Sequence, residues 1–285
     1  MTNIKEYSLG IFEKAIPFEI SWKDKLSAAK SAGFDFVELS IDGSDERIAR
    51  LDDISGLAQT INLSAHEAGI GVRSVSVSAL RRYALGSADE IKRERGFEIA
   101  AGTVCLAEKI GARLVQIAGC DVCYEQSNEK TMMFYEENLL KIALEGAKRG
   151  VLIGIEPMET EYMDTVEKAV KCVKKIKSPY LGIYPDTSGL YNAALKYESD
   201  MIKDLNSGAE RIIAIHCQET TGLSGDFLLF GEGNIDFPRV IANAWNLGVR
   251  RFTAEYVYKN RSNWSENISL TARYLRNVID DIAKQ

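Results

Sequence analysis

Four side chains that can bind a metal ion occupy the same kind of position in the sequence, the end of a short apolar run. They are Glu156 in VLIGIEPM, Asp186 in LGIYPDTSG, His216 in RIIAIHCQE and Glu255 in RFTAEYVY. The intervals between them are 30, 30 and 39 residues, and one strand-plus-helix unit takes roughly 30 to 40 residues. Four consecutive parallel strands would therefore bring two Glu, one Asp and one His to the same rim. Such a set of ligands predicts a divalent metal site.

Each of these residues also has an ordinary structural explanation. A carboxylate at a strand end is often a helix N-cap or a surface residue, and a lone histidine is more often a hydrogen-bonded core residue than a ligand. All four residues occur at the same position of successive units, and one of them is one of only two histidines in the chain. Their joint occurrence therefore favours the metal site. Oxygen-rich ligation with one imidazole suits Zn²⁺, Mn²⁺, Co²⁺ or Mg²⁺. The sequence therefore predicts one divalent ion of open identity.

Several nearby residues compete with this assignment. Glu159, Glu161 and Glu219 become rival ligands if a strand end is displaced by two or three residues. The second histidine, His66, falls in the helical stretch INLSAHEAG and is expected at the surface or as a capping residue.

The elements that must position these residues follow from the alternation of apolar runs with amphipathic stretches. The predicted strands are 7–12, 36–40, 72–78, 114–118, 151–156, 181–186, 212–217 and 252–256. The clearest predicted helices are 21–32, 54–68, 88–110, 129–149, 164–176, 236–247 and 264–282, with a weaker one near 198–207. Eight such units without a linker predict a single (β/α)8 TIM-barrel domain over residues 1–285, with the metal site at the C-terminal ends of the last four strands. An open doubly wound sheet is the alternative, but no Gly-rich dinucleotide fingerprint follows the first strand.

Composition excludes several classes of protein. The net charge of −6 comes without a basic block, which argues against a nucleic-acid binder. No apolar run approaches the 18 residues of a membrane span, and MTNIKEYSLG lacks the apolar core of a signal peptide. The five cysteines are an odd number, which favours reduced thiols in the cytoplasm. Cys120 and Cys123 form one isolated C-x-x-C pair, and two reduced thiols in a loop are expected there rather than a zinc or redox site.

Several short segments connect the sequence to a known family. The most specific are GIFEKA at 10–15, RRYALGS at 81–87 and FGEG at 230–233, whereas GFDFVELS at 33–40 is shared widely among sugar isomerases and related nucleases. With QIAGCDV at 116–122 and YPD at 184–186, they extend over most of the chain. Together with the four candidate ligands, they resemble the xylose-isomerase-like TIM barrels that epimerise ketoses at C3. The resemblance is closer to the L-ribulose-5-phosphate (L-xylulose-5-phosphate) 3-epimerases of pentose and ascorbate catabolism.

The resemblance implies a function for the four residues. In that family the positions matching Glu156, Asp186, His216 and Glu255 bind the metal, and those matching Glu156 and Glu255 also transfer protons. Epimerisation removes the C3 proton of a 2-ketose and returns one to the opposite face. A metal on the C2 and C3 oxygens stabilises the enediolate, and two carboxylates supply base and acid. The family also implies a homo-oligomer, most simply a dimer, with a small sugar or sugar phosphate as its partner.

Three departures from the family pattern leave the substrate open. Leu80 stands where a histidine is frequent, Gln218-Glu219 where a Lys-Asp pair is frequent, and Tyr256-Val257 where a Met-Trp pair is frequent. A free-ketose 3-epimerase or an aldose–ketose isomerase on the same barrel therefore stays possible. An abasic-site endonuclease would need several more histidines. A barrel that only binds sugar, without catalysis, would have no need of the two glutamates.

A phosphorylated sugar requires cations near the site. Lys14, Arg81 and Arg82 follow the first and third predicted strands, on the expected active rim. We expect one or more of them to contact the substrate phosphate. The alternative is that the two arginines pair with acidic helix residues such as Asp89 and Glu90.

Overall fold

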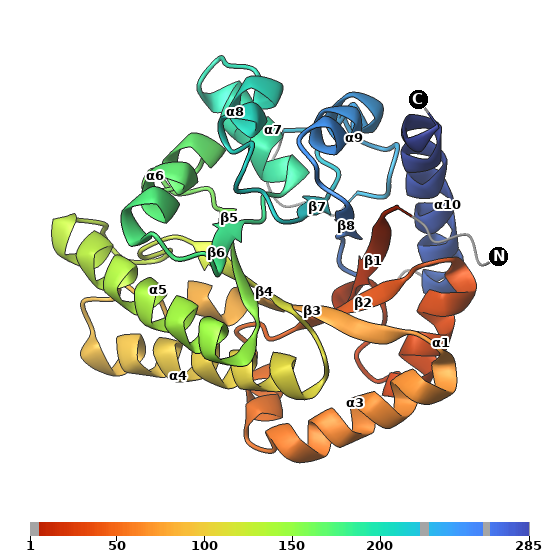
Figure 1. Cartoon of the computed structure of the whole chain (residues 1–285), viewed down its shortest axis with the longest axis horizontal. Coiled ribbons are helices and arrows are strands. Elements are labelled where there is room, and N and C mark those ends of the chain that lie inside the picture. The colour runs from red at the N-terminus through yellow and green to blue at the C-terminus, as the bar shows by residue number, and fades with distance from the viewer. Residues whose placement is uncertain (1–5, 223–227, 259–262, 285) are drawn as a thin grey trace.

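The computed structural model, which describes residues 6–222, 228–258 and 263–284, is built around a sheet of eight parallel strands (Figure 1). The strands are β1 (Ser8–Phe12), β2 (Phe36–Ser40), β3 (Gly71–Val77), β4 (Leu114–Gly119), β5 (Leu152–Pro157), β6 (Leu181–Ile183), β7 (Ile215–Cys217) and β8 (Arg251–Ala254). Their order in the sheet is β6-β5-β4-β3-β2-β1-β8-β7. Two isolated parallel bridges, Ile183↔Ile212 and Asp186↔His216, join the two ends of this order. The sheet therefore closes into the predicted TIM barrel.

Helices surround the strands (Figure 1). They are α1 (Trp22–Ala32), α2 (Asp45–Ile48), α3 (Ile54–Ala68), α4 (Glu90–Lys109), α5 (Glu129–Arg149), α6 (Val166–Ile176), α7 (Thr187–Lys196), α8 (Met201–Ser207), α9 (Phe237–Asn246) and α10 (Trp264–Ala283). Local sequence explains where many of them begin and end. For example, Asn128 and Thr131 form a capping box at the start of α5, and Gly150 ends that helix in the left-handed conformation at φ 65°.

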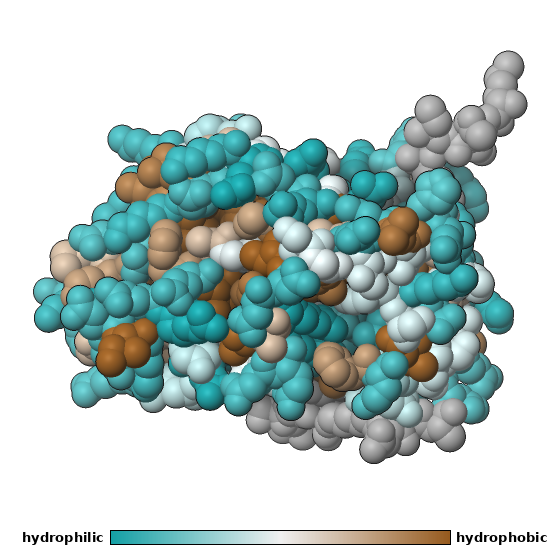
Figure 2. Space-filling model, turned by 90° about the horizontal axis from the view of Figure 1, so that it is seen from below, coloured by the Kyte–Doolittle hydropathy of each residue, from teal (hydrophilic) through white to brown (hydrophobic). Residues whose placement is uncertain are grey.

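An apolar core fills the space between strands and helices. Leu9, Val75 and Ile153 on the strands are fully buried together with Leu26 on α1 and Leu139 on α5. Figure 2 views the molecule from the side of α3 and α4, where hydrophilic residues cover most of the surface and apolar residues form separate patches. Within the described ranges, no helix is long and apolar enough to cross a membrane.

The predicted elements agree closely with the structure, with one substantial omission. The sequence pattern predicts a strand to residue 186 and no element from there to the weak helix near 198–207, whereas the structure has the helix α7 (Thr187–Lys196) in this interval. The strand β6 ends at Ile183, and Asp186 itself is the N-cap of α7. The weak helix predicted near 198–207 corresponds to α8.

The prediction of two reduced thiols at the C-x-x-C pair is wrong. Cys120 and Cys123 form a disulfide in the loop that connects β4 to α5. The loop bends so that their Cα atoms are 5.9 Å apart, which is within the range that a disulfide requires. Spacing along the chain could not reveal this bend. The remaining cysteines, Cys105, Cys172 and Cys217, are free.

Candidate metal centre

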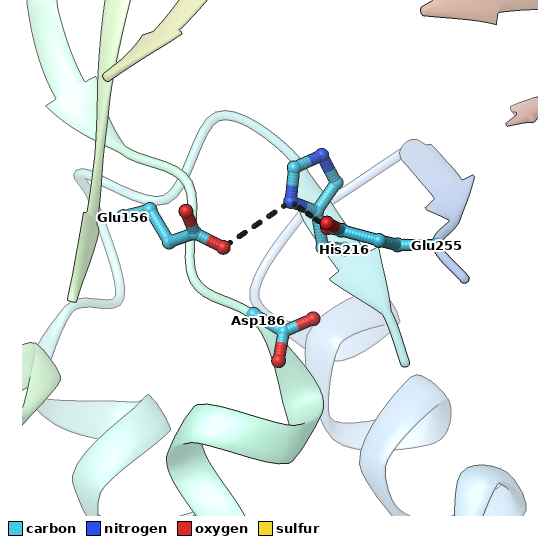
Figure 3. Close-up of side chains that lie close together, drawn as sticks. All are labelled: Glu156, Asp186, His216 and Glu255. Atoms are coloured by element: carbon cyan, nitrogen blue, oxygen red, sulfur yellow. Dashed lines mark hydrogen bonds and ion pairs between the residues drawn. The ribbon is translucent and has the colours of Figure 1, made fainter. Parts of the chain in front are cut away.

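The four predicted ligands meet at the C-terminal rim of the barrel. Each of Glu156, Asp186, His216 and Glu255 offers one ligand atom, and these atoms all lie within 4.8 Å of one another. Figure 3 shows the four side chains converging on one space. Metal bonds of about 2.1 Å place the ligands of one ion up to roughly 4.2 Å apart. Small rotations of these side chains would therefore bring all four atoms onto a single ion.

The closed sheet explains why residues so far apart in the sequence come together. Glu156 is paired with Ala118 of the neighbouring strand, and the bridge between Asp186 and His216 aligns the ends of β6 and β7. The backbone N–H of Glu255 donates to the carbonyl of Cys217 at 2.8 Å, which aligns β8 with β7. Parallel strands in register place the residues at their ends on the same rim.

Direct contacts link three of the four side chains, and Asp186 is held by the backbone that follows it. The Nδ1 atom of His216 lies 2.8 Å from Oε2 of Glu255 and 3.5 Å from Oε1 of Glu156 (Figure 3). Asp186 uses one oxygen, Oδ1, to accept from the backbone N–H groups of Ser188 at 2.8 Å and Gly189 at 3.0 Å. Asp186 therefore fulfils the ordinary role of a helix cap while its other carboxylate oxygen can face an ion.

The electrostatics of the cluster fit a divalent cation. Burial raises the pKa of Asp186 to about 7, and the nearby charges of Glu255 and Glu156 add to this effect. Burial and the charge of Glu255 likewise raise the pKa of Glu156. Three carboxylates brought this close repel one another unless a positive charge lies between them. Three oxygen donors and one imidazole form a suitable ligand set for such an ion.

Two further residues of the site were missed by the sequence prediction. On β4, Gln116 donates from Nε2 to the Oε2 atom of Glu156. On β2, Glu38 contacts the Nε2 atom of His216 at 2.5 Å. The sequence did contain a signal for both, because Glu38 in FVELS and Gln116 in LVQIA are polar residues inside otherwise apolar strands.

A cavity of about 380 Å³ opens beside the four residues, a size suited to a small ligand. Its walls mix apolar side chains such as Phe12 and Val257 with polar ones such as Ser76, Asn192 and Gln218. Glu156, Asp186 and Glu255 form part of the lining. A bound molecule would therefore contact the carboxylates directly.

The three predicted substrate-binding cations occupy different positions. Lys14 and Arg81 line the cavity, and Lys14 also pairs with Asp42 at 2.9 Å. Arg82 is not part of the lining; its side chain is 51% exposed and pairs with Asp45 at 2.9 Å. The alternative, a pairing with an acidic helix residue, therefore holds for Arg82 through Asp45 of α2, whereas no pair with Asp89 or Glu90 is seen within the described residues.

The rival ligands have other partners. Glu219 is buried and accepts from the backbone N–H groups of Gly231 at 2.9 Å and Ile235 at 3.1 Å, so it anchors the loop that contains FGEG. Glu159 lines the cavity and accepts from Asn192. Neither belongs to the converging cluster, nor does Glu161. His66 is exposed on α3, as expected.

Comparisons with known proteins agree with this architecture. Residues 26–278 match the family model described as xylose isomerase-like TIM barrel. SgbU of Escherichia coli strain K12 is 37% identical over 253 residues, which cover 87% of each chain. The L-ribulose-5-phosphate 3-epimerase UlaE of Salmonella paratyphi A is 32% identical over 263 residues, covering 92% of this chain and 90% of UlaE.

Solved structures of low sequence identity share the fold. An L-ribulose 3-epimerase is 20% identical, with a TM-score of 0.73 over 98% of this chain and 96% of its own. The D-allulose 3-epimerase of Methylomonas sp. is 15% identical, with a TM-score of 0.76 over 98% of this chain and 100% of its own.

Proposed function

Since the chain belongs to the xylose isomerase-like TIM-barrel family, we propose that it is a metal-dependent 3-epimerase that interconverts L-ribulose 5-phosphate and L-xylulose 5-phosphate. The observation that carries this proposal is the convergence of Glu156, Asp186, His216 and Glu255 beside a cavity of small-molecule size. The relationship to UlaE, itself an L-ribulose-5-phosphate 3-epimerase, supports the choice of substrate.

The four residues would hold one divalent ion, Zn²⁺, Mn²⁺, Co²⁺ or Mg²⁺. When bound, the ion would polarise the substrate oxygens at C2 and C3 and so acidify the C3 proton. Asp186 and His216 complete the ligand set, and neither is required for proton transfer.

Glu156 and Glu255 are the proposed acid and base. They extend from β5 and from the end of β8, between which β6 and β7 lie, and they stand on either side of His216 in Figure 3. A ketose held between them would present one face of C3 to each carboxylate. One glutamate removes the C3 proton and the other returns a proton to the opposite face. Their roles exchange when the reaction runs in the other direction.

Gln116 assists the proposed proton transfer by orienting the carboxylate of Glu156. Because Nε2 of Gln116 donates to Oε2 of Glu156, the carboxylate is held in one orientation. Its other oxygen, Oε1, is the one that approaches His216. A carboxylate that is already fixed loses less conformational entropy when it is positioned against the reacting carbon.

The phosphate group requires positive charge in the same cavity. Lys14 and Arg81 line it, which supports a role for both in phosphate binding. For Arg82 the same role stays a prediction, and its pairing with Asp45 makes Arg81 the stronger candidate. The cytoplasmic location and the homodimer also stay predictions.

NMR in D₂O tests the proposal directly. L-Ribulose 5-phosphate, incubated with metal-loaded protein, should yield L-xylulose 5-phosphate that carries deuterium at C3. Glu156→Gln and Glu255→Gln should each abolish this product. Deuterium at C3 of a free ketose alone would instead identify a free-ketose epimerase. An aldose product, in which the carbonyl has moved from C2 to C1, would identify an isomerase.

A further inference from the structure

Glu38 is a charged residue in a place where charge is costly. It lies in the middle of β2 and its side chain is 0% exposed. Within the described part of the chain, no lysine or arginine pairs with it. An isolated carboxylate inside a barrel would destabilise the fold unless other groups compensate its charge. The groups that surround Glu38 therefore indicate why it is there.

The groups around Glu38 connect it to His216 of the candidate metal centre. The Oε1 atom of Glu38 lies 2.5 Å from Nε2 of His216, and Oε2 accepts from the hydroxyl of Tyr184 at 3.0 Å. The Tyr184 hydroxyl is also 2.7 Å from Oγ1 of Thr253. The Tyr184 ring packs against the imidazole of His216, with centroids 4.2 Å apart. All four residues are at least 99% buried, so this network is fixed from every side.

The two ring nitrogens of His216 face opposite environments. Nδ1 faces Glu156 and Glu255, whereas Nε2 faces Glu38. A neutral imidazole has one N–H donor and one nitrogen with a free lone pair. Nδ1 can bind an ion only if it has the lone pair, so the proton must be on Nε2. Glu38 is the group that accepts this proton in a hydrogen bond.

We infer that Glu38 is a positioning residue of the metal centre, which fixes the tautomer and orientation of His216 so that Nδ1 faces the ion. This inference rests on the proposed function, because it concerns a residue of the same site. The negative charge of Glu38 also makes the imidazole a stronger ligand. In turn, a bound ion would supply through His216 the positive charge that the buried carboxylate of Glu38 lacks.

A purely structural role is the competing explanation. In that case Glu38, Tyr184 and Thr253 form a polar network that holds the strands together, and removing Glu38 lowers thermal stability alone. The folded fraction would then bind metal as the wild type does. Metal affinity, measured on folded protein, therefore separates the two explanations.

Isothermal titration with Zn²⁺ and Mn²⁺ is the first test. Loss of a group that orients a metal ligand typically weakens metal binding about 10- to 100-fold. Glu38→Gln keeps an oxygen that can accept from Nε2 but loses the charge, so we expect about a tenfold loss. Glu38→Ala loses both, so we expect about a hundredfold loss. If Glu38→Ala does not fold, the nearly isosteric Glu38→Gln keeps the test intact.

The matched control is Thr103→Val. Thr103 is also 0% exposed, but its hydroxyl donates only to the Ile99 carbonyl within α4. This variant loses a buried hydrogen bond without touching the site, so its metal affinity should equal that of the wild type. Equal affinities for Glu38→Gln and wild type would overturn the inference and leave the proposed function intact. A wild-type protein that binds no divalent ion would overturn both.

NMR of ¹⁵N-histidine-labelled protein reports the tautomer itself. The chain has only two histidines, and His66→Asn, on the exposed surface of α3, leaves a single imidazole signal. In the Zn²⁺-loaded protein we expect the proton on Nε2 and the metal on Nδ1. In Glu38→Ala the Nε2 proton should exchange faster. A metal-bound Nε2 in the wild type would overturn the inference.

Discussion

Asp186 is both the N-cap of α7 and a candidate metal ligand. Its Oδ1 caps α7, while its position in the cluster makes it a candidate ligand. The cap determines where α7 begins and so holds the carboxylate at the rim. The sequence permitted either explanation for this residue, and the structure shows that the two do not exclude each other.

The two tasks can be separated by substitution. Asparagine caps a helix about as well as aspartate, so Asp186→Asn should retain thermal stability. It lacks the charge that attracts an ion, so metal affinity should fall at least about tenfold. Asp186→Ala should lose about 1 kcal/mol of stability in addition, because the cap is gone. Titration calorimetry and thermal unfolding measure the two effects. A metal affinity in Asp186→Asn equal to that of the wild type would remove Asp186 from the ligand set.

Arg81 and Arg82 offer a matched pair for the phosphate. Arg81 lines the cavity and Arg82 does not. A hydrogen bond to a charged group contributes about 1.5–3 kcal/mol, so Arg81→Ala should raise KM for L-ribulose 5-phosphate about 10- to 100-fold. KM for the free ketose should hardly change, and Arg82→Ala should have a small effect on both. Steady-state kinetics with the phosphorylated and the free ketose measures these KM values. The same effect of Arg81→Ala on both substrates would exclude a phosphate contact.

At the scale of elements, a buried ionic cluster links β1 to its neighbours. Glu13 is 0% exposed and contacts Lys25 of α1 at 3.0 Å, Arg47 of α2 at 2.9 Å and Arg50 at 2.7 Å. It also accepts from the backbone N–H of Ser40 at the end of β2. The carboxylate of Glu13, the residue before Lys14, therefore connects four segments, which are α1, α2, the residues around Arg50 and the end of β2.

This cluster predicts a specific dependence of stability on acid. Burial would raise the pKa of Glu13, but Arg50, Arg47 and Lys25 together lower it to about 2. In the unfolded chain the pKa is about 4.3. The ionised group therefore stabilises the fold fully above about pH 4.3, by about 3 kcal/mol, and this contribution is lost as pH falls towards 2.

Glu13→Gln tests the dependence. Its free energy of unfolding should be lower than that of the wild type at pH 6, and the difference should shrink between pH 4.5 and pH 2. Denaturant unfolding at a series of pH values measures it. A difference that is constant with pH would show that the charge of Glu13 does not stabilise the fold.

The loop between β4 and α5 carries the disulfide. Cys120 follows directly after β4 and bonds to Cys123 three residues later. By the chain-entropy relation, so small a ring stabilises the fold by about 2 kcal/mol, which corresponds to roughly 5 °C in the midpoint of thermal unfolding. A reducing agent should lower the midpoint of the wild type by this amount and leave Cys123→Ser unchanged. No response of the wild type would mean that the two thiols are not bonded.

At the scale of the whole molecule, the candidate metal centre lies where the strand pairing is least regular. Seven neighbouring strand pairs form ladders, whereas the segments around β6 and β7 are joined by two isolated bridges and the backbone hydrogen bonds beside them. The candidate ligands come from β5, from the segment after β6, from β7 and from the end of β8. A bound ion would therefore connect the strands on both sides of this seam.

Metal should consequently stabilise the entire fold. An ion present at 100 times its dissociation constant adds about 2.7 kcal/mol to the free energy of unfolding, or roughly 5–10 °C in the midpoint. Calorimetry with and without EDTA measures the shift. A single cooperative transition would also support the predicted single domain. A midpoint that does not respond to Zn²⁺ or Mn²⁺ would contradict the metal centre.

Much of this architecture could be predicted from local patterns. Continuous apolar runs with amphipathic stretches between them identify parallel strands and covering helices, because both faces of such a sheet are buried. A polar residue at the end of an apolar run marks the rim. Those two rules were sufficient to locate all eight strands and the four converging residues.

The repeating elements and the strand ends that carry the candidate ligands could therefore be predicted, since both depend on residues close together in the chain. The groups that surround those ligands could be identified only once the chain was folded. Glu38 and His216 are 178 residues apart and in contact, and Gln116 reaches Glu156 across 40 residues. Likewise, the bend that joins Cys120 to Cys123 follows from the path of its loop. Such contacts depend on how a closed barrel brings distant side chains together, which no local pattern of residues records.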